Sequence, residues 1–203
     1  MEKGLFITFE GIDGVGKTTQ AQRLVCKLEE LGSDVTFTRE PGGTSIGQRI
    51  RRLLLDPDLK QLSQQTEVFL YAADRAQHVQ ELIKPQLESG KTVICDRYVD
   101  SSIAYQGFGL GWDPQMIRAI NSWAIMEIVP DITLCLDQDP ELALAKTSGD
   151  RIEIRTLDYY RRVRTGYYQI AKDEPSRFHI IPAAGSVEEV FTRIWHIIKG
   201  RVI

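Results

Sequence analysis

The segment Gly11-Ile12-Asp13-Gly14-Val15-Gly16-Lys17-Thr18 constrains the fold of this chain more than any other feature of its sequence. A mostly apolar, strand-forming run over 5–9 precedes it, and apolar residues recur at helical spacing after it, up to Gly32. A glycine-rich loop between a buried strand and a helix can point backbone N–H groups at phosphate oxygens, and the helix N-terminus adds partial positive charge. The sequence therefore predicts a nucleoside triphosphate site built from nine consecutive residues: Gly11, Ile12, Asp13, Gly14, Val15, Gly16, Lys17, Thr18 and Thr19.

Two side chains of this loop and the end of a second strand supply the predicted chemistry. Lys17 is expected to reach the β- and γ-phosphates, and the Thr18 hydroxyl to ligate Mg²⁺. Asp96 ends the apolar run 92–95 and is the second expected magnesium ligand, directly or through water. Arg97 follows it and suits a bidentate hold on another phosphate, the alternative being an exposed Asp-Arg pair. Because no later strand is followed by the Asn-Lys-x-Asp motif of GTP-binding switches, a second anionic substrate is favoured over a regulatory switch.

The order of predicted elements indicates an α/β fold with a mostly parallel five-stranded sheet covered by helices on both faces. We expect one domain over 1–203. The carboxyl ends of the strands should converge on one ligand cleft. Strands are predicted over 5–9, 34–38, 92–95, 132–136 and 178–181, and helices over 47–55, 65–87, 114–126, 140–146, 155–172 and 187–199.

Composition narrows the class of protein. The 203 residues carry a net charge of −3, so no global basic field favours nucleic acid or an anionic membrane as a partner. No apolar run is long enough to span a bilayer and no secretory signal is evident, so a cytoplasmic location is expected. Cys26, Cys95 and Cys135 show no Cys-x-x-Cys spacing and are expected to be buried thiols in a reducing compartment.

Tyr71 and Arg75 are four residues apart, so on a helix they share one face. An aromatic ring one turn from a guanidinium suits a nucleoside monophosphate, whose base stacks while its phosphate is bound. For Tyr71 taken alone, core packing is the favoured interpretation. Arg75 stands in a mostly apolar stretch, and a buried arginine needs an anionic partner.

The chain resembles the bacterial thymidylate kinase family essentially from end to end. The combination of Arg-Glu-Pro-Gly-Gly and Asp-Arg-Tyr with a later Tyr-Gln-Gly, in this order and spacing, is far more specific than the glycine loop alone. The matching segments are 9–20, 38–44, 71–75, 96–98, 101–102, 104–107, 130–134 and 150–153.

The resemblance implies ATP-dependent phosphorylation of dTMP to dTDP, with Mg²⁺ as cofactor and a homodimer as the assembly. Its catalytic residues would be Lys17, Asp96, Arg97 and Arg151. The substrate residues implied by the matching positions are Tyr71 stacking on thymine, Ser102 and Gln106 at its edge, Arg51, Arg75 and Arg97 on the phosphate, and Asp13 or Glu40 on the sugar hydroxyl. The loop 182–186 lies where the family packs adenine.

One departure from the family concerns the cation near the transferred group. Some members carry an arginine inside the glycine loop, but Gly14-Val15 offers none here. Members without it usually supply arginines from a mobile lid, which we expect at about 146–154, with Arg151 as the lid cation. The alternative for Arg151 is a surface pair with Asp150 or Glu153.

Two other functions stay open at this level. One is a P-loop kinase for another nucleoside monophosphate or a deoxynucleoside, although two phosphate-binding arginines favour a substrate that already bears a phosphate. The other is a non-catalytic nucleotide-binding regulator, which the intact set of Lys17, Thr18 and Asp96 disfavours.

Overall fold

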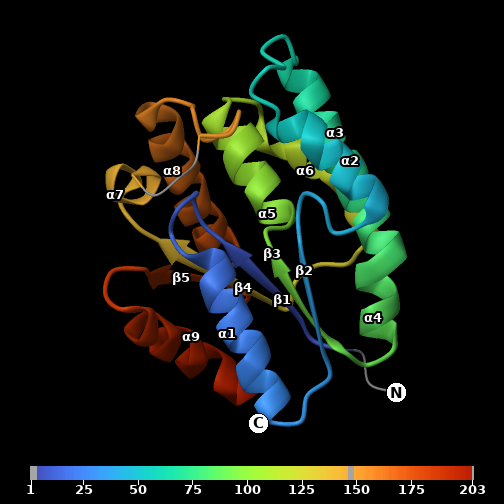
Figure 1. Ribbon diagram of the computed structural model, residues 1–203, viewed down its shortest axis with the longest axis vertical. Coiled ribbons are helices and arrows are strands. Elements are labelled where there is room, and N and C mark those ends of the chain that lie inside the picture. The colour runs from blue at the N-terminus through green and yellow to red at the C-terminus, as the bar shows by residue number, and fades with distance from the viewer. Residues whose placement is uncertain (1–3, 146–148, 203) are drawn as a thin grey trace.

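The computed structural model describes residues 4–145 and 149–202, and its centre is a five-stranded parallel sheet in the order β2-β3-β1-β4-β5 (Figure 1). The predicted α/β class and parallel sheet are therefore confirmed, and each expected strand is present within about one residue of its predicted bounds. The strands are β1 (Phe6–Glu10), β2 (Val35–Arg39), β3 (Thr92–Asp96), β4 (Ile132–Asp137) and β5 (Phe178–Pro182).

Strand β1 is the central strand and is buried at all five positions, which explains its nearly continuous apolar sequence. It pairs with β3 on one side and β4 on the other. The chain fills the β3 side of the sheet first and then crosses to the β4 side, so the strand order reverses at β1. The carboxyl end of β1 is thus the topological switch point where open α/β sheets bind ligands.

The helices lie on both sides of this sheet (Figure 1). Helix α1 packs on β1, β2 and β3 and also against α9. On the opposite face of β1, the Phe6 ring meets the Tyr98 ring edge-on at 5.0 Å, and Glu10 accepts a hydrogen bond from Tyr167 of α8. The helical bounds are α1 (Lys17–Glu30), α2 (Ser45–Leu55), α3 (Gln64–His78), α4 (Lys84–Glu88), α5 (Val99–Ser102), α6 (Pro114–Ile125), α7 (Pro140–Leu144), α8 (Leu157–Asp173) and α9 (Val187–Val202), with π-helical segments η1 (Val79–Ile83) and η2 (Ile103–Gly109).

The predicted single helix over 65–87 is divided in the structure. Helix α3 passes into the wider turns of η1, and α4 resumes with Pro85 in its first turn. Proline has no N–H to donate to the carbonyl of Glu81, so an α-helical ladder cannot run unbroken through this position. The π-helical turns absorb that missing bond without turning the chain away.

The helical stretch formed by α5 and η2 was not predicted. Its residues Ile103 to Gln106 are all buried, so no polar face marks a helical period in the sequence. Gly107 and Gly109, with the two serines before them, further lower the helical signal. This stretch packs closely against α8 and supplies several residues of the site described below.

The cysteine expectation holds for two of three positions. Cys95 and Cys135 lie on buried strands, whereas Cys26 is exposed because it falls outside the buried stripe of α1. Within residues 4–145 and 149–202, no helix has the length and apolarity needed to cross a membrane.

Candidate active site

The glycine loop leaves the carboxyl end of β1 and ends where α1 begins at Lys17. Gly11 has a φ of 129°, and a Cβ at this position would lie 2.3 Å from the carbonyl oxygen of Leu136. Gly16 precedes α1 with a φ of 95°. Both conformations favour glycine, so the loop sequence is set by backbone geometry and by close approach to β4.

Lys17 and Thr18 follow the loop on the first turn of α1. Lys17 is 7% exposed, and its Nζ donates to the carbonyl of Ile12 at 2.8 Å. Burial and the nearby charge of Arg97 lower the pKa of Lys17 to about 8. An ammonium placed in this way gains most from a phosphate oxygen, which would favour its charged form.

Thr18 and Asp96, the two expected magnesium ligands, lie side by side. The Thr18 hydroxyl donates to Asp96 Oδ2 at 2.5 Å, which joins the start of α1 to the end of β3. In the described part of the chain, no three His, Cys, Asp or Glu residues are grouped so that they could hold a metal ion. A hydroxyl and one carboxylate suit Mg²⁺ that takes its other ligands from phosphate oxygens and water.

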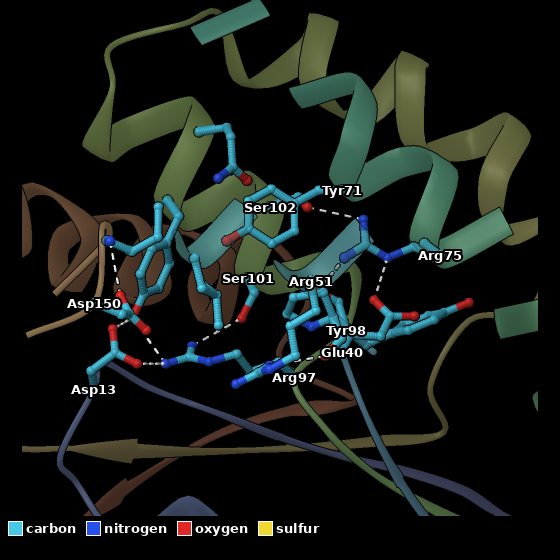
Figure 2. Close-up of a pocket in the computed structure, with 15 residues that line it drawn as sticks. Asp13, Glu40, Arg51, Tyr71, Arg75, Arg97, Tyr98, Ser101, Ser102 and Asp150 are labelled. Atoms are coloured by element: carbon cyan, nitrogen blue, oxygen red, sulfur yellow. Dashed lines mark hydrogen bonds and ion pairs between the residues drawn. The ribbon is translucent and has the colours of Figure 1, made fainter. Parts of the chain in front are cut away.

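Arg97 adopts a left-handed backbone conformation, with a φ of 71°, directly after β3. Figure 2 shows its guanidinium between Asp13 and Ser101, to both of which it donates, at 2.5 and 3.2 Å. It also donates to the carbonyl of Gly11 at 2.9 Å and to the hydroxyl of Tyr105 at 3.1 Å. Such a conformation is strained for a residue with a side chain and persists only where surrounding contacts hold it.

Asp13 is the anion that faces this guanidinium. Burial opposes its ionisation, but the positive charges of Arg97 and Lys17 prevail and lower the pKa of its carboxyl to about 2. Tyr105 donates to its second oxygen at 2.9 Å. Asp13 is therefore ionised at neutral pH and partly offsets the cations of the site.

Glu10 holds the turn around Arg97, and its role was not predicted from the sequence. It is completely buried and accepts hydrogen bonds from the backbone N–H groups of Tyr98 and Ser101, at 2.8 and 3.2 Å. Its other oxygen accepts from the hydroxyls of Ser101 and Tyr167. Burial and the charge of Asp100 raise the pKa of its carboxyl. By accepting these hydrogen bonds, the buried acid caps the start of the helical stretch that follows Tyr98.

Two pockets open at the carboxyl end of the sheet and share four lining residues: Asp13, Glu40, Arg51 and Arg97. One pocket continues along the glycine loop to Lys17, Thr18, Thr19 and Asp96. The other continues away from the loop. Two ligands can therefore meet end to end at a junction that contains two guanidinium groups.

The second pocket contains the predicted nucleoside-binding residues. Tyr71 and Arg75 line it from α3, as their spacing predicted, and Ser102 lines it from α5 (Figure 2). Gln106 lines it from η2. Arg51 reaches it from α2 and donates to the carbonyl of Pro41 at 2.9 Å. The structure thus brings all eight expected substrate residues together in one pocket: Asp13, Glu40, Arg51, Tyr71, Arg75, Arg97, Ser102 and Gln106.

Most N–H groups of Arg75 are already hydrogen-bonded within the protein, which limits its capacity to bind a phosphate. Its Nε donates to Glu40 at 2.8 Å, Nη1 donates to Ser102 and Asn121, and Nη2 donates to the carbonyl of Tyr98 at 3.0 Å. A guanidinium has five N–H bonds, so one Nη2 hydrogen is left for a ligand. A two-point hold on phosphate through Arg75 would break a protein contact.

Glu40 and Asp74 form the wall behind Arg75. Glu40 is 4% exposed and, besides Arg75, contacts His78 at 3.0 Å. Asp74 accepts a hydrogen bond from the N–H of Gly42 at 3.0 Å, while its Oδ2 has no hydrogen-bond partner in residues 4–145 and 149–202. Burial and the charge of Glu40 raise the pKa of Asp74 to about 6.

Arg151 lies away from the glycine loop in this structure. Its Nε donates to the carbonyl of Leu54 at 2.7 Å and its Nη2 to Glu67 at 2.8 Å. Glu67 is thus its ion-pair partner, rather than the Asp150 or Glu153 considered from the sequence. Residues 146–148 of the predicted lid lie outside the described residues, and 149–154 form a turn whose N–H groups bond to Asp150 and Glu153.

Sequence reasoning missed several residues that line the pockets: Arg39, Ser101, Tyr105, Asp150 and Ile152. All five stand inside segments that carry the family resemblance, so position within a motif was the available signal. Tyr167 of α8 is buried and donates to Glu10.

Comparisons with known proteins agree with this geometry. A family model described as thymidylate kinase matches residues 9–194. The thymidylate kinase of Halothermothrix orenii is 50% identical, over 99% of this chain and 99% of that protein, and the one from Pelotomaculum thermopropionicum is 50% identical over 90% and 87%. The crystal structure of thymidylate kinase from Ehrlichia chaffeensis is similar with a TM-score of 0.81 and 37% identity, covering 97% of this chain and 99% of that one.

Asp74→Asn should flatten the pH dependence of folding stability. The pKa of Asp74 rises from 3.8 to about 6 on folding, so its contribution to stability is complete below pH 4 and is lost as the pH rises through 6. That loss is at most about 3 kcal/mol. Asparagine keeps the acceptor for Gly42 without the charge. Urea denaturation from pH 4 to 8 should show a smaller decline in the variant. Asp58→Asn, at an exposed position, is the control, and an unchanged decline in Asp74→Asn would refute the assignment.

Proposed function

The chain belongs to the thymidylate kinase family, and we infer that it transfers the terminal phosphoryl group of ATP directly to the phosphate of dTMP, forming dTDP for dTTP synthesis. The observation that carries this inference is the junction between the two pockets, which Asp13, Glu40, Arg51 and Arg97 line together. A triphosphate on the glycine loop and a monophosphate in the second pocket would meet there with their phosphates facing each other.

On the donor side, the backbone of the glycine loop and Lys17 are placed to bind the ATP phosphates. The loop 182–186 is proposed as the adenine contact. Gln20 of α1 donates to the carbonyl of Val187 at 2.9 Å, and this bond keeps the start of α9 beside the glycine-loop helix. The donor site would therefore extend from the glycine loop after β1 to the loop between β5 and α9.

Mg²⁺ would be held by Thr18 and Asp96, whose oxygens already lie in contact. When bound, the metal neutralises charge on the phosphate oxygens and orients them. Both residues line the pocket along the glycine loop, so an ion bound there could reach their oxygens.

On the acceptor side, Arg97 and Arg51 are the proposed phosphate ligands, and Arg75 adds its single remaining N–H. Tyr71 would stack on the thymine ring, and its hydroxyl would face water or the ligand. Ser102 and Gln106 would contact the edge of the base, and Asp13 or Glu40 the sugar hydroxyl. All of these residues line the second pocket.

The mechanism needs no nucleophilic side chain and no strong general base. The phosphate of dTMP is itself anionic at neutral pH, and phosphoryl transfer depends on positioning and charge neutralisation. The site must bring two polyanions together. Lys17, Arg51 and Arg97 supply fixed positive charge where they meet, in a partly buried setting that strengthens it.

The two alternatives remain distinguishable by experiment. A kinase for another monophosphate would keep the junction and change the base end of the second pocket. A regulator would bind ATP without turnover. The family names of the relatives support dTMP as the acceptor, and a cytoplasmic location fits a nucleotide-synthesis enzyme.

A homodimer is proposed through an exposed apolar stripe on α6. Met116 and Trp123, seven residues apart on α6, are 39 and 88% exposed, and Met126, directly after the helix, is 52% exposed. Helix α3 packs against α6 and exposes Phe69 beside it. Apolar side chains gathered in this way commonly mark a protein interface, and a second copy of the chain fits the family's assembly.

Activity against a panel of acceptors tests the proposed function. ADP release from ATP and Mg²⁺ should be fast with dTMP and slow with UMP, CMP, AMP and GMP. Lys17→Ala should abolish turnover because it removes the charge beside the transferred phosphate, while circular dichroism shows an intact fold. Preference for another monophosphate would change the substrate, and tight ATP binding without turnover would favour the regulator.

Arg151→Ala is expected to lower kcat by about 100-fold with little change in dTMP affinity, as for loss of one charge-stabilising group in the transition state. This requires Arg151 to leave Glu67 during turnover. Arg155→Ala is the matched control because Arg155 pairs with the same carboxylate. An equal fall of kcat in both variants would mean that the loss arises at Glu67, and unchanged turnover would exclude Arg151.

Trp123→Glu should convert the protein to a monomer, since a charge would be buried in the apolar contact. Sedimentation velocity at several protein concentrations measures the change. Leu31→Glu, at a position 49% exposed at the end of α1, is the control and should leave the assembly unchanged. A monomeric wild type, or a dimeric Trp123→Glu, would rule out this interface.

A further inference from the structure

Glu67 is a buried carboxylate that receives three hydrogen bonds, one from η2 and two from the turn that precedes α8. It lies in the first turn of α3 and is 1% exposed. Its Oε1 accepts from Gln106 Nε2 at 3.1 Å, and its Oε2 accepts from Arg151 Nη2 at 2.8 Å and Arg155 Nη2 at 2.5 Å. No role for this residue follows from the sequence motifs.

The chemistry of these partners determines how the Gln106 carboxamide is oriented. Both guanidinium groups donate to Oε2, and a carboxylate paired with two arginines presents its other oxygen, Oε1, as an acceptor too. The amide nitrogen of Gln106 must therefore face Glu67, because the reverse orientation would place two acceptor oxygens against each other. The carbonyl oxygen of Gln106 accepts no hydrogen bond from any residue in 4–145 or 149–202, although the side chain is only 2% exposed and lines the second pocket. It is left as an acceptor for a ligand.

Gln106 lies at the base end of that pocket. The phosphate end of the pocket is its junction with the pocket along the glycine loop, where the two pockets share lining residues. Gln106, Tyr71 and Ser102 line only the second pocket. A base placed beside Tyr71 would thus present its hydrogen-bonding edge within reach of an acceptor whose direction is set by Glu67.

We propose that Glu67 is a specificity-determining positioning residue, which selects 4-oxopyrimidine nucleotides by fixing the carbonyl of Gln106 toward the base. This inference rests on the proposed function. Thymine and uracil carry N–H at N3 and can donate to that carbonyl. Cytosine has an unprotonated N3, so two acceptors would face each other, and a buried unmet acceptor is costly.

Because two arginines pair with Glu67, the carboxylate keeps one partner if the other arginine moves away. A buried carboxylate left without a partner is strongly destabilising. If Arg151 moves to the transferring phosphoryl group, Arg155 still pairs with Glu67, and Arg155 also lies over the Tyr159 ring, 4.7 Å from its centroid. Gln106 then keeps its orientation throughout turnover.

Glu67→Gln tests the proposal, because the substitution keeps the shape and lets residue 67 either donate or accept. Gln106 is then free to turn, and the ratio of kcat/KM for dTMP to that for dCMP should fall at least about tenfold, partly through a gain with dCMP. A merely structural role would lower both activities and leave the ratio unchanged, and that result would overturn the proposal.

A double-mutant cycle separates Glu67 from other causes. In a Gln106→Leu background the ratio should already be low, and adding Glu67→Gln should not change it further, because both act through one contact. Equal effects of Glu67→Gln in both backgrounds would overturn the proposal. If Glu67→Gln does not fold, Gln106→Leu alone decides, since an unchanged ratio there shows that Gln106 does not read the base. A wild type inactive on dTMP would instead refute the proposed function.

Discussion

The contact between Arg97 and the glycine loop is the interaction on which the site depends. One guanidinium bonds to the Gly11 carbonyl, to Asp13 and to Tyr105, and so ties the loop after β1 to the helical stretch after β3. The backbone of Arg97 takes a left-handed conformation that directs its side chain toward the glycine loop. Glu10 stabilises this turn by accepting hydrogen bonds from the backbone N–H groups of Tyr98 and Ser101. The triphosphate site and the second pocket therefore share one rigid wall, which fixes the distance between two ligands.

Several buried charged side chains of this protein are held in ion pairs. Arg75 with Glu40 and Arg177 with Asp100 are ion pairs with little solvent exposure. Such pairs add little net stability, but removing one partner is expensive. Here they fix the positions of α3 and α5 relative to the strands. The side chains that face the ligand are therefore positioned before a ligand binds.

The strands and the glycine loop were the most predictable parts of the molecule, because each is encoded locally. A buried parallel strand reads as a short apolar run, and the loop needs glycine where φ is positive. Helix α3 was predicted with Tyr71 and Arg75 on one face, since helical spacing is also local. The break at η1 and the helix over 99–109 were missed, because a proline within an apolar helix can be absorbed by π-turns and a fully buried helix shows no polar period.

The sequence by itself determined the fold class, the position of the phosphate loop, many of the residues that line the cleft and, through its motifs, the family. Only the tertiary structure decided what those residues contact. It showed that Arg75 donates most of its N–H groups to other protein groups and that Arg151 pairs with Glu67. It also showed that Glu10 and Glu67 hold residues of the site in position through buried hydrogen bonds. The physical reason is that these contacts join residues far apart in the chain, such as Glu67 with Arg151. Hydrogen-bond partners across such separations are set by packing and leave no periodic signal in the sequence.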